Sequence, residues 1–304
     1  MFGAIFLVLF FVVLFLPANR VISNTCLFAL PQKHLLLKNT PGPRIILIGG
    51  SNLSYGIDSR MIRDSLHLNP INCGIHACIG LNFMLEDYYH YVRENDIVVI
   101  APEYNHFYGD FADGDINLLS ILVDISPQYS DCSRIQLLKL LKSAPEYGCA
   151  KLKLWNYFAK TDTIIIDPND KRGFNEFGDN NIHWTMTKEK NIKSMSIDGA
   201  LNKELFKRLK DFETKLKKKH VTMYITFPSF QQTSFNMQRG KIDTIESMLK
   251  ANDFSILGTA DRYKMDDSLM FDTAYHLTKN AADHRTALLI EDLKMAIKEN
   301  KDRQ

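Results

Sequence analysis

The sequence RIILIGGSNLSYG, residues 44–56, decides the fold of this chain. After Arg44 it begins with an unbroken apolar, largely β-branched run, which is typical of a parallel strand buried on both faces. Two glycines and Ser51 follow directly, and a helix is expected over 59–66. A strand that passes through a glycine-rich turn into a helix is the repeating unit of an α/β protein.

Three later apolar runs also read as strands, each preceded by an amphipathic helix. Strands that alternate with helices in this way pair in parallel and indicate an α/β domain. The strands are expected at 96–101, 221–227 and 254–257, the helices before them at 81–93, 202–219 and 242–251, and a last helix at 286–298.

The segment 105–199 breaks this alternation. Aromatic, Asp and Asn residues dominate it, and it contains apolar helical stretches at 118–125 and 135–141. A connection of this length is unusual as a simple loop. We therefore predict an inserted helical cap within a soluble domain that spans 44–298.

Composition excludes a disordered chain, a collagen-like chain and a polytopic membrane protein. The chain has 304 residues, of which 45% are hydrophobic and 24% charged, which is the mixture of a globular protein. Its net charge of +2 gives no global attraction for nucleic acid, and the lysine-rich stretch 207–220 is expected to be a solvated helix face. Five cysteines are too few for a disulfide scaffold and lack zinc-site spacing, although Cys132 and Cys149 are candidates for a pair in an exported domain. No metal or cofactor is predicted.

The N-terminus carries the longest apolar stretch. Residues 2–16 contain no charge, and their length is at the lower limit for crossing a bilayer, about 17 residues. A signal anchor is favoured over a cleaved signal peptide, because a basic n-region and an Ala-x-Ala site are missing, and over a buried core helix. We predict a membrane anchor or signal segment at 1–18 and a linker at 19–43, in which LFAL and HLLL are able to dock on the domain.

Two motifs suggest a catalytic site. Ser51 lies at the carboxyl end of the first strand, where open α/β sheets bind ligands. Asp272 and His276 come before the last helix and are close enough to meet within one turn. A histidine base activates a serine hydroxyl, and a carboxylate orients that histidine. The alternatives are a phosphate-binding turn at 49–52 and a helix cap at 272–276.

Together the motifs resemble the SGNH, or GDSL-like, hydrolase family. Gly49-Gly50-Ser51 matches its first block, and Asp272 and His276 match its last, with one residue more between them than the usual Asp-x-x-His. Residues 72–80 (NCGIHACIG) look like the second block, which supplies an oxyanion-hole glycine. The resemblance covers most of 44–298 and implies a three-layer sandwich with a flavodoxin-like parallel sheet. The oxyanion or substrate-binding candidates are then Gly50, Gly74 and Gly80.

The third block departs from the family pattern. It normally ends its strand with Gly-x-Asn, whose Asn donates to the oxyanion, whereas this strand ends Ala-Pro-Glu103-Tyr-Asn105. An ionised Glu103 cannot donate, so the oxyanion hole is different or incomplete, and Asn105 is a candidate replacement. Further candidates to line the site are His76 and the polar run 173–179 with His183 and Trp184. The alternatives are a structural role for His76 and a turn-rich surface loop for the polar run.

The anchor, the serine turn and the Tyr-His-Leu element at 275–277 are closest to membrane-anchored polysaccharide and teichoic-acid acyl-transfer proteins. Such proteins usually act beside a membrane-bound O-acyltransferase. The resemblance implies a single-pass membrane protein with an extracytoplasmic domain, acting as a serine esterase or O-acyltransferase on acylated glycans or small acyl esters. The alternatives are a non-catalytic accessory protein that binds glycan or the acyltransferase, and a cytoplasmic-facing lipid esterase.

Overall fold

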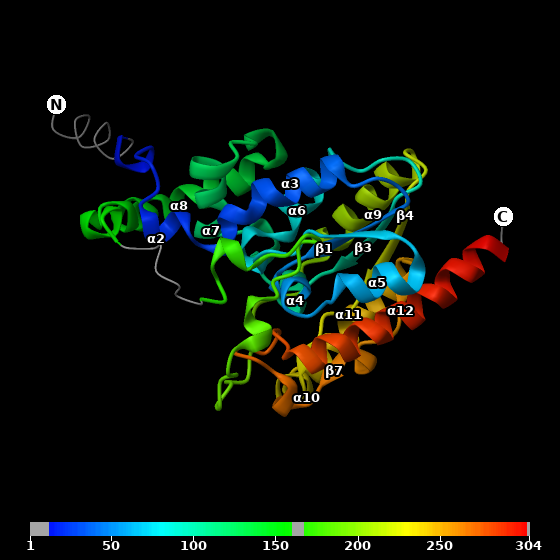
Figure 1. The fold of residues 1–304 in the computed structure, drawn as a ribbon. Helices are drawn as coiled ribbons and strands as arrows, with labels where there is room; N and C mark the ends of the chain where they lie inside the picture. The colour runs from blue at the N-terminus through cyan, green and yellow to red at the C-terminus, as the bar shows by residue number, and fades with distance from the viewer. Residues whose placement is uncertain (1–11, 160–166, 303–304) are drawn as a thin grey trace.

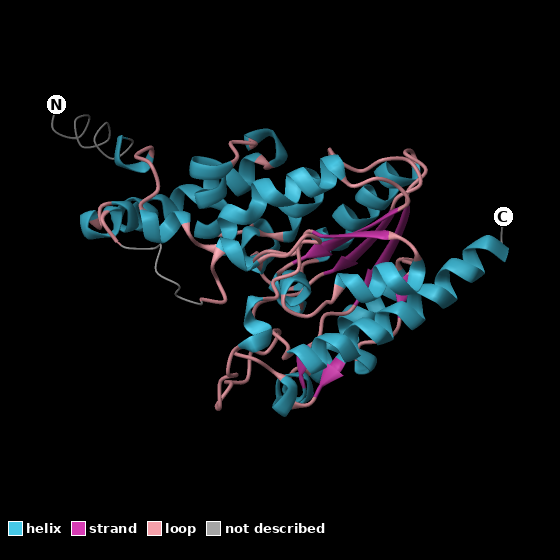
Figure 2. Ribbon diagram, viewed as in Figure 1, coloured by secondary structure: helices cyan, strands magenta, loops and turns pink. Residues whose placement is uncertain are grey.

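A five-stranded, fully parallel sheet forms the centre of the molecule (Figures 1 and 2). The computed structural model describes residues 12–159 and 167–302. The strand order is β2-β1-β3-β4-β6, which becomes 2-1-3-4-5 when only strands of this sheet are counted, as in doubly wound flavodoxin-like proteins. The predicted α/β class and parallel sheet are confirmed. The strands are β1 (Arg44–Gly49), β2 (Asn69–Asn72), β3 (Ile97–Ala101), β4 (Thr222–Thr226) and β6 (Ile256–Leu257).

Helices cover both faces of the sheet and complete three layers. Side chains of a strand alternate between the faces, so Ile46 and Ile48 enter one core while Ile45 and Leu47 enter the other. Figure 1 shows α3 and α6 on one side of the sheet and α5 and α12 on the other. The first layer contains α3 (Leu30–Asn39), α6 (Leu81–Tyr89), α9 (Lys203–Lys217) and α11 (Arg239–Ala251), and the second contains α5 (Ser59–Leu66) and α12 (Lys279–Asp302).

Strand β2 is the one strand of the main sheet that the sequence did not predict. Its residues, NPIN, have little β propensity, and proline cannot donate to a ladder. The strand forms because it lies at the edge of the sheet, where Pro70 pairs with Ile45 across β1. Tertiary pairing therefore overrides the local preference.

Residues 19–43, predicted as a linker in which LFAL and HLLL could dock on the domain, are largely helical, and these two stretches pack into its core. The segment forms α2 (Arg20–Ser23), a 3₁₀ turn η1 (Cys26–Ala29) and α3. Leu30 and Leu37 are fully buried, and Lys33 is buried beside them and donates to the carbonyl of Asn72 at 2.8 Å. Pro31 suggested a break in structure, but it lies in the first turn of α3, where proline is tolerated.

The segment 105–199 contains helices of its own. The two expected helical stretches are present, as α7 (Ile116–Ser120) with the π-helical turn η5 (Ile121–Ile125), and as α8 (Arg134–Lys151). Short 3₁₀ turns complete the segment: η3 (Tyr104–Phe107), η4 (Phe111–Asp113), η6 (Tyr129–Asp131), η7 (Leu154–Tyr157), η8 (Lys171–Gly173) and η9 (Ile182–Thr185).

A second, two-stranded parallel sheet lies apart from the first (Figure 2). It pairs Phe230 with Lys264 and Gln231 with Met265. The elements not yet named are α4 (Ser51–Ser54), η2 (Ala77–Ile79), β5 (Phe230–Gln231), α10 (Gln232–Met237), η10 (Asp261–Tyr263), β7 (Lys264–Met265) and η11 (Asp267–Leu269).

The predicted anchor at 1–18 falls mostly outside the described residues, which begin at Val12. Over 12–159 and 167–302, no helix combines the length and the apolar character needed to cross a bilayer.

Candidate functional site

The candidate site is built on the loops that leave the carboxyl ends of neighbouring strands. Ser51 follows β1, the segment 73–80 follows β2, and Glu103 follows β3. Because the strands are parallel, these loops share one edge of the sheet, which is the edge where doubly wound proteins bind ligands. His276 joins them from the segment before α12, with its ring stacked on the Tyr55 ring at 4.0 Å between centroids.

Ser51 is the first residue of the short helix α4, and its half-buried side chain lies just outside the sheet. The Ser51 N–H has no acceptor among the described residues, so it is free to donate to a substrate. Asn52 fixes the turn to β3, because its Nδ2 donates to the Ala101 carbonyl at 3.1 Å. The buried Arg285 of α12, which the sequence did not single out, donates to Asn52 Oδ1 at 3.3 Å from the other side.

Two glycines allow the loop after β2 to pack directly against this turn. A Cβ on Gly50 would lie 2.7 Å from Glu103 Oε1 and 2.8 Å from Ala77 Cβ. A Cβ on Gly74 would lie 2.8 Å from the Gly50 carbonyl oxygen. Real Cβ atoms do not approach other atoms so closely, so both positions require glycine. The glycines are therefore needed for close packing beneath and beside Ser51.

Glu103 is the immediate neighbour of the Ser51 hydroxyl. Ser51 Oγ donates to Glu103 Oε1 at 3.3 Å, and the Asn52 N–H donates to the same oxygen at 3.2 Å. Glu103 is only 5% exposed. Burial raises the pKa of Glu103 above its usual 4.5, against the opposing effects of the His276 charge and these hydrogen bonds. The neutral carboxyl is thus favoured here more than it is in an exposed glutamate.

His106 holds Glu103 and the loop after β2 together, and sequence reasoning missed it. Its Nδ1 accepts the Glu103 N–H at 3.1 Å, so Nε2 carries the proton and donates to the Ala77 carbonyl at 3.1 Å. Burial lowers the pKa of His106 to about 4, which keeps the ring neutral. The three-residue spacing from Glu103 to His106, typical of a capping box, was the available signal.

Asp272 and His276 form a hydrogen-bonded pair despite the extra residue between them. His276 Nδ1 lies 2.7 Å from Asp272 Oδ1. The chain between them curls into a turn that the Phe271 N–H closes by donating to the His276 carbonyl at 2.8 Å. The turn absorbs the additional residue. The ring of His276 is mostly buried, and its Nδ1 is engaged, which leaves Nε2 as the nitrogen able to exchange a proton with a substrate or serine.

Ser51 and His276 share the site but are not hydrogen-bonded to each other in this structure. The Ser51 hydroxyl is turned towards Glu103. The connection to His276 runs through Tyr55, whose N–H donates to the Ser51 carbonyl at 2.9 Å and whose ring stacks on His276. Tyr55 therefore links the backbone of the serine turn to the ring of His276.

Two of the three glycine N–H groups predicted for an oxyanion hole, those of Gly74 and Gly80, are already used. The Gly74 N–H donates to Asn72 Oδ1 at 2.9 Å. The Gly80 N–H donates to the Ala77 carbonyl at 2.9 Å, and Gly80 has a φ of 82° in a turn packed on Gly114. Backbone geometry requires glycine at both positions, and neither N–H is free to donate to a substrate in this structure.

Asn105 is likewise engaged elsewhere. Its Nδ2 donates to the Ser196 carbonyl at 3.3 Å, and its Oδ1 accepts the Tyr275 hydroxyl at 3.2 Å. The residue therefore joins the loop after β3 to the segment that carries His276. It has a positioning contact in place of the predicted oxyanion contact, because Glu103 occupies the position closest to Ser51.

The polar run 173–179 is largely buried, with Glu176 as its exposed residue, so it is more than a surface loop. Asp179 is fully buried and accepts from Ser59 Oγ at 2.6 Å and from Asn72 Nδ2 at 2.8 Å. His183 is also buried, with Nε2 bonded to the Leu277 carbonyl at 3.0 Å, and burial lowers its pKa to about 4. This run supports the serine turn from inside the protein.

His76 is half-buried near the site. Its Nδ1 accepts the Cys78 N–H at 3.2 Å. Burial lowers the pKa of His76, and the positive charge of a protonated His276 lowers it further, so the two rings share one electrostatic neighbourhood. The lowered pKa favours the neutral imidazole form of His76.

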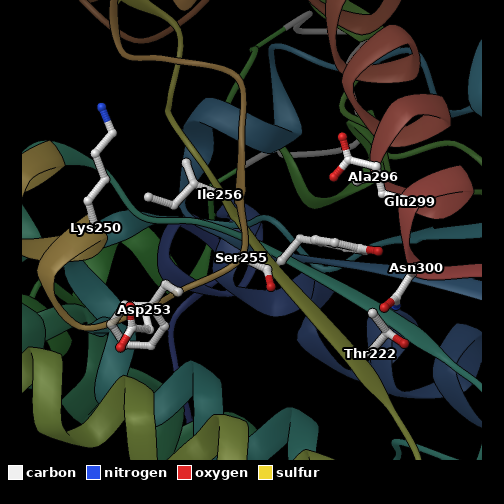
Figure 3. A pocket seen from close by; sticks show the side chains of 10 residues that line it. Thr222, Lys250, Asp253, Ser255, Ile256, Ala296, Glu299 and Asn300 are labelled. Carbon is white, nitrogen blue, oxygen red and sulfur yellow. The ribbon is translucent and has the colours of Figure 1, made fainter. Parts of the chain in front are cut away.

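A cavity of about 450 Å³ lies at the opposite edge of the sheet (Figure 3). It is lined by the first residue of β4, Thr222, by the segment 253–256 and by the end of α12. Ser51, Glu103 and His276 do not line this cavity. Within the described ranges no group of three His, Cys, Asp or Glu side chains is arranged to hold a metal ion, and Cys132 and Cys149 are free thiols.

Neither a scan against protein-family models nor a search of curated proteins found a match to this chain.

Proposed function

We propose that this chain is a membrane-anchored serine esterase or O-acyltransferase of the SGNH-like type. The observation that carries the proposal is the 2.7 Å bond between Asp272 and His276, close to Ser51 at the ligand-binding edge of the sheet. A half-buried serine with a free backbone N–H and a carboxylate-oriented histidine nearby are the parts that acyl-ester chemistry needs.

The proposed reaction begins when Ser51 Oγ attacks the carbonyl carbon of an acyl ester. His276 Nε2 accepts the hydroxyl proton, and Asp272 stabilises the resulting imidazolium. The ester C–O bond then breaks as the alcohol leaves with that proton, and an acyl-Ser51 ester remains. Water or a sugar hydroxyl gives its proton to Nε2 and attacks the acyl carbon. The bond from that carbon to Ser51 Oγ then breaks, and Oγ takes the proton back from Nε2, which regenerates the serine and releases the acid or the new ester. Ser51 must first rotate from Glu103 to His276.

The oxyanion of the tetrahedral intermediate is assigned two donors. The first is the Ser51 N–H, which has no acceptor among the described residues. The second is Glu103 in its neutral form, since a protonated carboxyl is able to donate as an amide does. Glu103 follows β3 at the position where SGNH-like hydrolases place asparagine. Its burial and its contact with Ser51 support this assignment.

The substrate class follows from the resemblance and the N-terminal sequence. The uncharged residues 2–16 and the likeness to polysaccharide and teichoic-acid acyl-transfer proteins support an extracytoplasmic domain on a single-pass anchor. Acylated glycans are the proposed substrates, with a membrane-bound O-acyltransferase as partner. A cap that excludes water would favour transfer to a sugar over hydrolysis.

A non-catalytic accessory role is the second candidate. The Ser51 hydroxyl is bonded to Glu103 and not to His276, and the Gly74 and Gly80 N–H groups are already used. A protein that binds glycan or an acyltransferase would tolerate this arrangement, because binding does not require an activated serine.

Labelling by a fluorophosphonate probe distinguishes the two roles. Wild type should be labelled at Ser51, and Ser51→Ala should lose both the label and turnover of a small acyl ester. Ser54→Ala, which removes a hydroxyl from the same short helix, is the matched control and should keep both. Thermal unfolding checks that all three proteins are folded.

Equal ester turnover by wild type and Ser51→Ala would remove the nucleophile assignment. A folded wild type that is neither labelled nor active, together with cellular function that survives Ser51→Ala, would establish the accessory role.

A further inference from the structure

An exposed apolar stripe runs along the outer side of α8. Ile135, Leu138, Leu141 and Leu152 are between 50% and 66% exposed. Pro145 and Cys149 are exposed between them. These positions recur every three or four residues, so they lie on one side of the helix. We call this stripe the α8 face.

The α8 face is not needed for the core, because the opposite side of the helix already packs there. Leu140, Ala144 and Tyr147 are buried in the main hydrophobic core. A surface helix normally pairs such a buried side with a polar one. Here both sides are apolar, and a contiguous exposed apolar surface of this kind marks an interaction site.

The exposed apolar surface continues beyond α8. Leu154, Trp155 and Phe158 are 65%, 87% and 78% exposed, and Val12 and Phe15 are 56% and 60% exposed. The end of the apolar N-terminal run thus exposes apolar side chains, as residues 154–158 do.

Hydrogen bonds hold these two elements together. Lys151 Nζ donates to the carbonyls of Leu14 and Leu16 at 2.6 Å each, and the Tyr157 hydroxyl donates to the Pro17 carbonyl at 2.9 Å. α2 contacts η7, which follows α8, and Figure 1 shows α2 and α8 at one end of the molecule, far from the end of α12. These bonds join residues 14–17 to the buried side of α8 at its last residue and to residue 157, so both exposed apolar segments lie beside the end of the α8 face at Leu152.

Charge around this surface is mainly basic. Arg20, Arg134, Lys142 and Lys153 are exposed beside it, against Glu146 as the exposed acidic residue of α8. Basic residues beside an apolar stripe attract anionic lipid headgroups, and tryptophan favours the membrane interface. α8 itself lacks the apolar character to cross a bilayer. A helix of this kind lies in the plane of the interface.

We propose that the α8 face rests in the interfacial region of an anionic bilayer, so that the domain contacts the membrane along α8 as well as through the N-terminal segment. Membrane contact along α8 rests on the proposed N-terminal anchor but requires no chemistry at Ser51. The occupant of the α8 face is the lipid surface, because exposed basic side chains and the exposed Trp155 lie beside the apolar stripe.

Tryptophan fluorescence in vesicles tests this contact. The full chain has two tryptophans, so Trp184→Phe leaves Trp155 as the reporter near η7. Leu138→Trp, combined with Trp155→Phe and Trp184→Phe, places a reporter near the start of α8, about 25 Å along the chain from residue 155. Trp155→Phe alone leaves Trp184, which packs against Lys279 of α12, as the matched control.

Each protein is bound to vesicles of phosphatidylcholine and phosphatidylglycerol, with and without lipids brominated high on one acyl chain. The reporters at 138 and 155 should shift to shorter wavelength and lose intensity about twofold, because an interfacial helix buries its apolar side about 5–10 Å deep. Trp184 should change little. Vesicles of phosphatidylcholine alone should quench the reporter at 138 less. Circular dichroism and thermal unfolding confirm the fold of each variant.

The decisive position is 138. Quenching at 155 alone would mean that the N-terminal segment holds only the near end of the domain at the membrane, and the proposal would be wrong. A bound, folded protein whose reporter at 138 stays open to acrylamide in water would also overturn it and leave the α8 face for a protein partner. Activity of Ser51 variants has no bearing on either result.

Discussion

Replacing Glu103 tests whether a neutral carboxyl acts as the second oxyanion donor. Glu103→Gln preserves the carbonyl oxygen that accepts from Ser51 and Asn52 and supplies an N–H donor at every pH. Glu103→Ala removes donor and acceptor together. Loss of one oxyanion donor costs about 10²–10³ in kcat, or about 3–4 kcal/mol. We therefore expect Glu103→Gln to remain active and Glu103→Ala to lose about 10²–10³ in kcat.

Glu103→Ala should also destabilise the fold. The Asn52 N–H is buried and would lose its acceptor, which costs about 1–3 kcal/mol in the free energy of unfolding. Glu103→Gln keeps that acceptor and should unfold close to the wild-type temperature at neutral pH. Thermal unfolding of the three proteins therefore separates the structural effect of the alanine variant from its effect on kcat.

The direction of the Glu103 pKa shift predicts how kcat/KM depends on pH. The pKa of Glu103 in the folded protein is raised above 4.5 by burial, so the wild type loses its donor as pH rises through that raised value. Glu103→Gln does not titrate. The ratio of kcat/KM for Glu103→Gln to that of wild type should therefore increase with pH above about 4.5. Taking the ratio removes every other titrating group common to both proteins.

Stability should follow the same ionisation. The folded state binds the Glu103 proton more tightly than the unfolded state does, so this group's contribution to the free energy of unfolding is greatest at low pH. It decreases as pH rises from the unfolded pKa through the raised folded pKa. A ratio that stays flat with pH, or a Glu103→Gln variant as inactive as Glu103→Ala, would refute the donor role. The second result would show that Ser51 needs a carboxylate acceptor.

Two further substitutions test the catalytic pair and the packing of the serine turn. Asp272→Asn should reduce kcat for ester turnover by about 10⁴, because an amide at the 2.7 Å contact with Nδ1 no longer sets the His276 tautomer or stabilises the imidazolium; a loss under about tenfold, with unchanged unfolding, would mark the pair as a structural turn. Gly74→Ala should lower the free energy of unfolding by about 1–3 kcal/mol, because its Cβ would meet backbone atoms at 2.8 Å. Gly240→Ala, where a Cβ meets nothing within 4 Å, is the matched control and should be neutral or stabilising by about 0.4–1 kcal/mol in urea unfolding; equal effects at the two glycines would contradict the packing argument.

The sequence alone determined the central architecture, because continuous apolar runs mark buried parallel strands. Strand β1 and helix α5 have the bounds that the pattern predicted. It also placed Asp272 and His276 close together, since four residues span a single turn. These inferences succeed because the physical signal lies within a few neighbouring residues.

Only the tertiary structure decided what surrounds Ser51. The contact with Glu103 and the stacking of Tyr55 on His276 join segments that are far apart in the sequence, in the second case by 221 residues. The bond from Gly74 to Asn72 depends on the path of a loop that the sequence pattern does not specify. Proline and asparagine at 69–72 concealed a strand that exists because β1 pairs with it.

The role of buried polar side chains was equally hidden. Lys33 read as part of a linker and Asp179 as part of a loop, yet both are buried beneath the serine turn and bonded to the strand end at Asn72. A polar residue in a sequence is ordinarily taken as exposed, because burying it without partners costs free energy. Its hydrogen-bond partners come from distant parts of the chain, so only the folded structure shows the bonds that offset this cost.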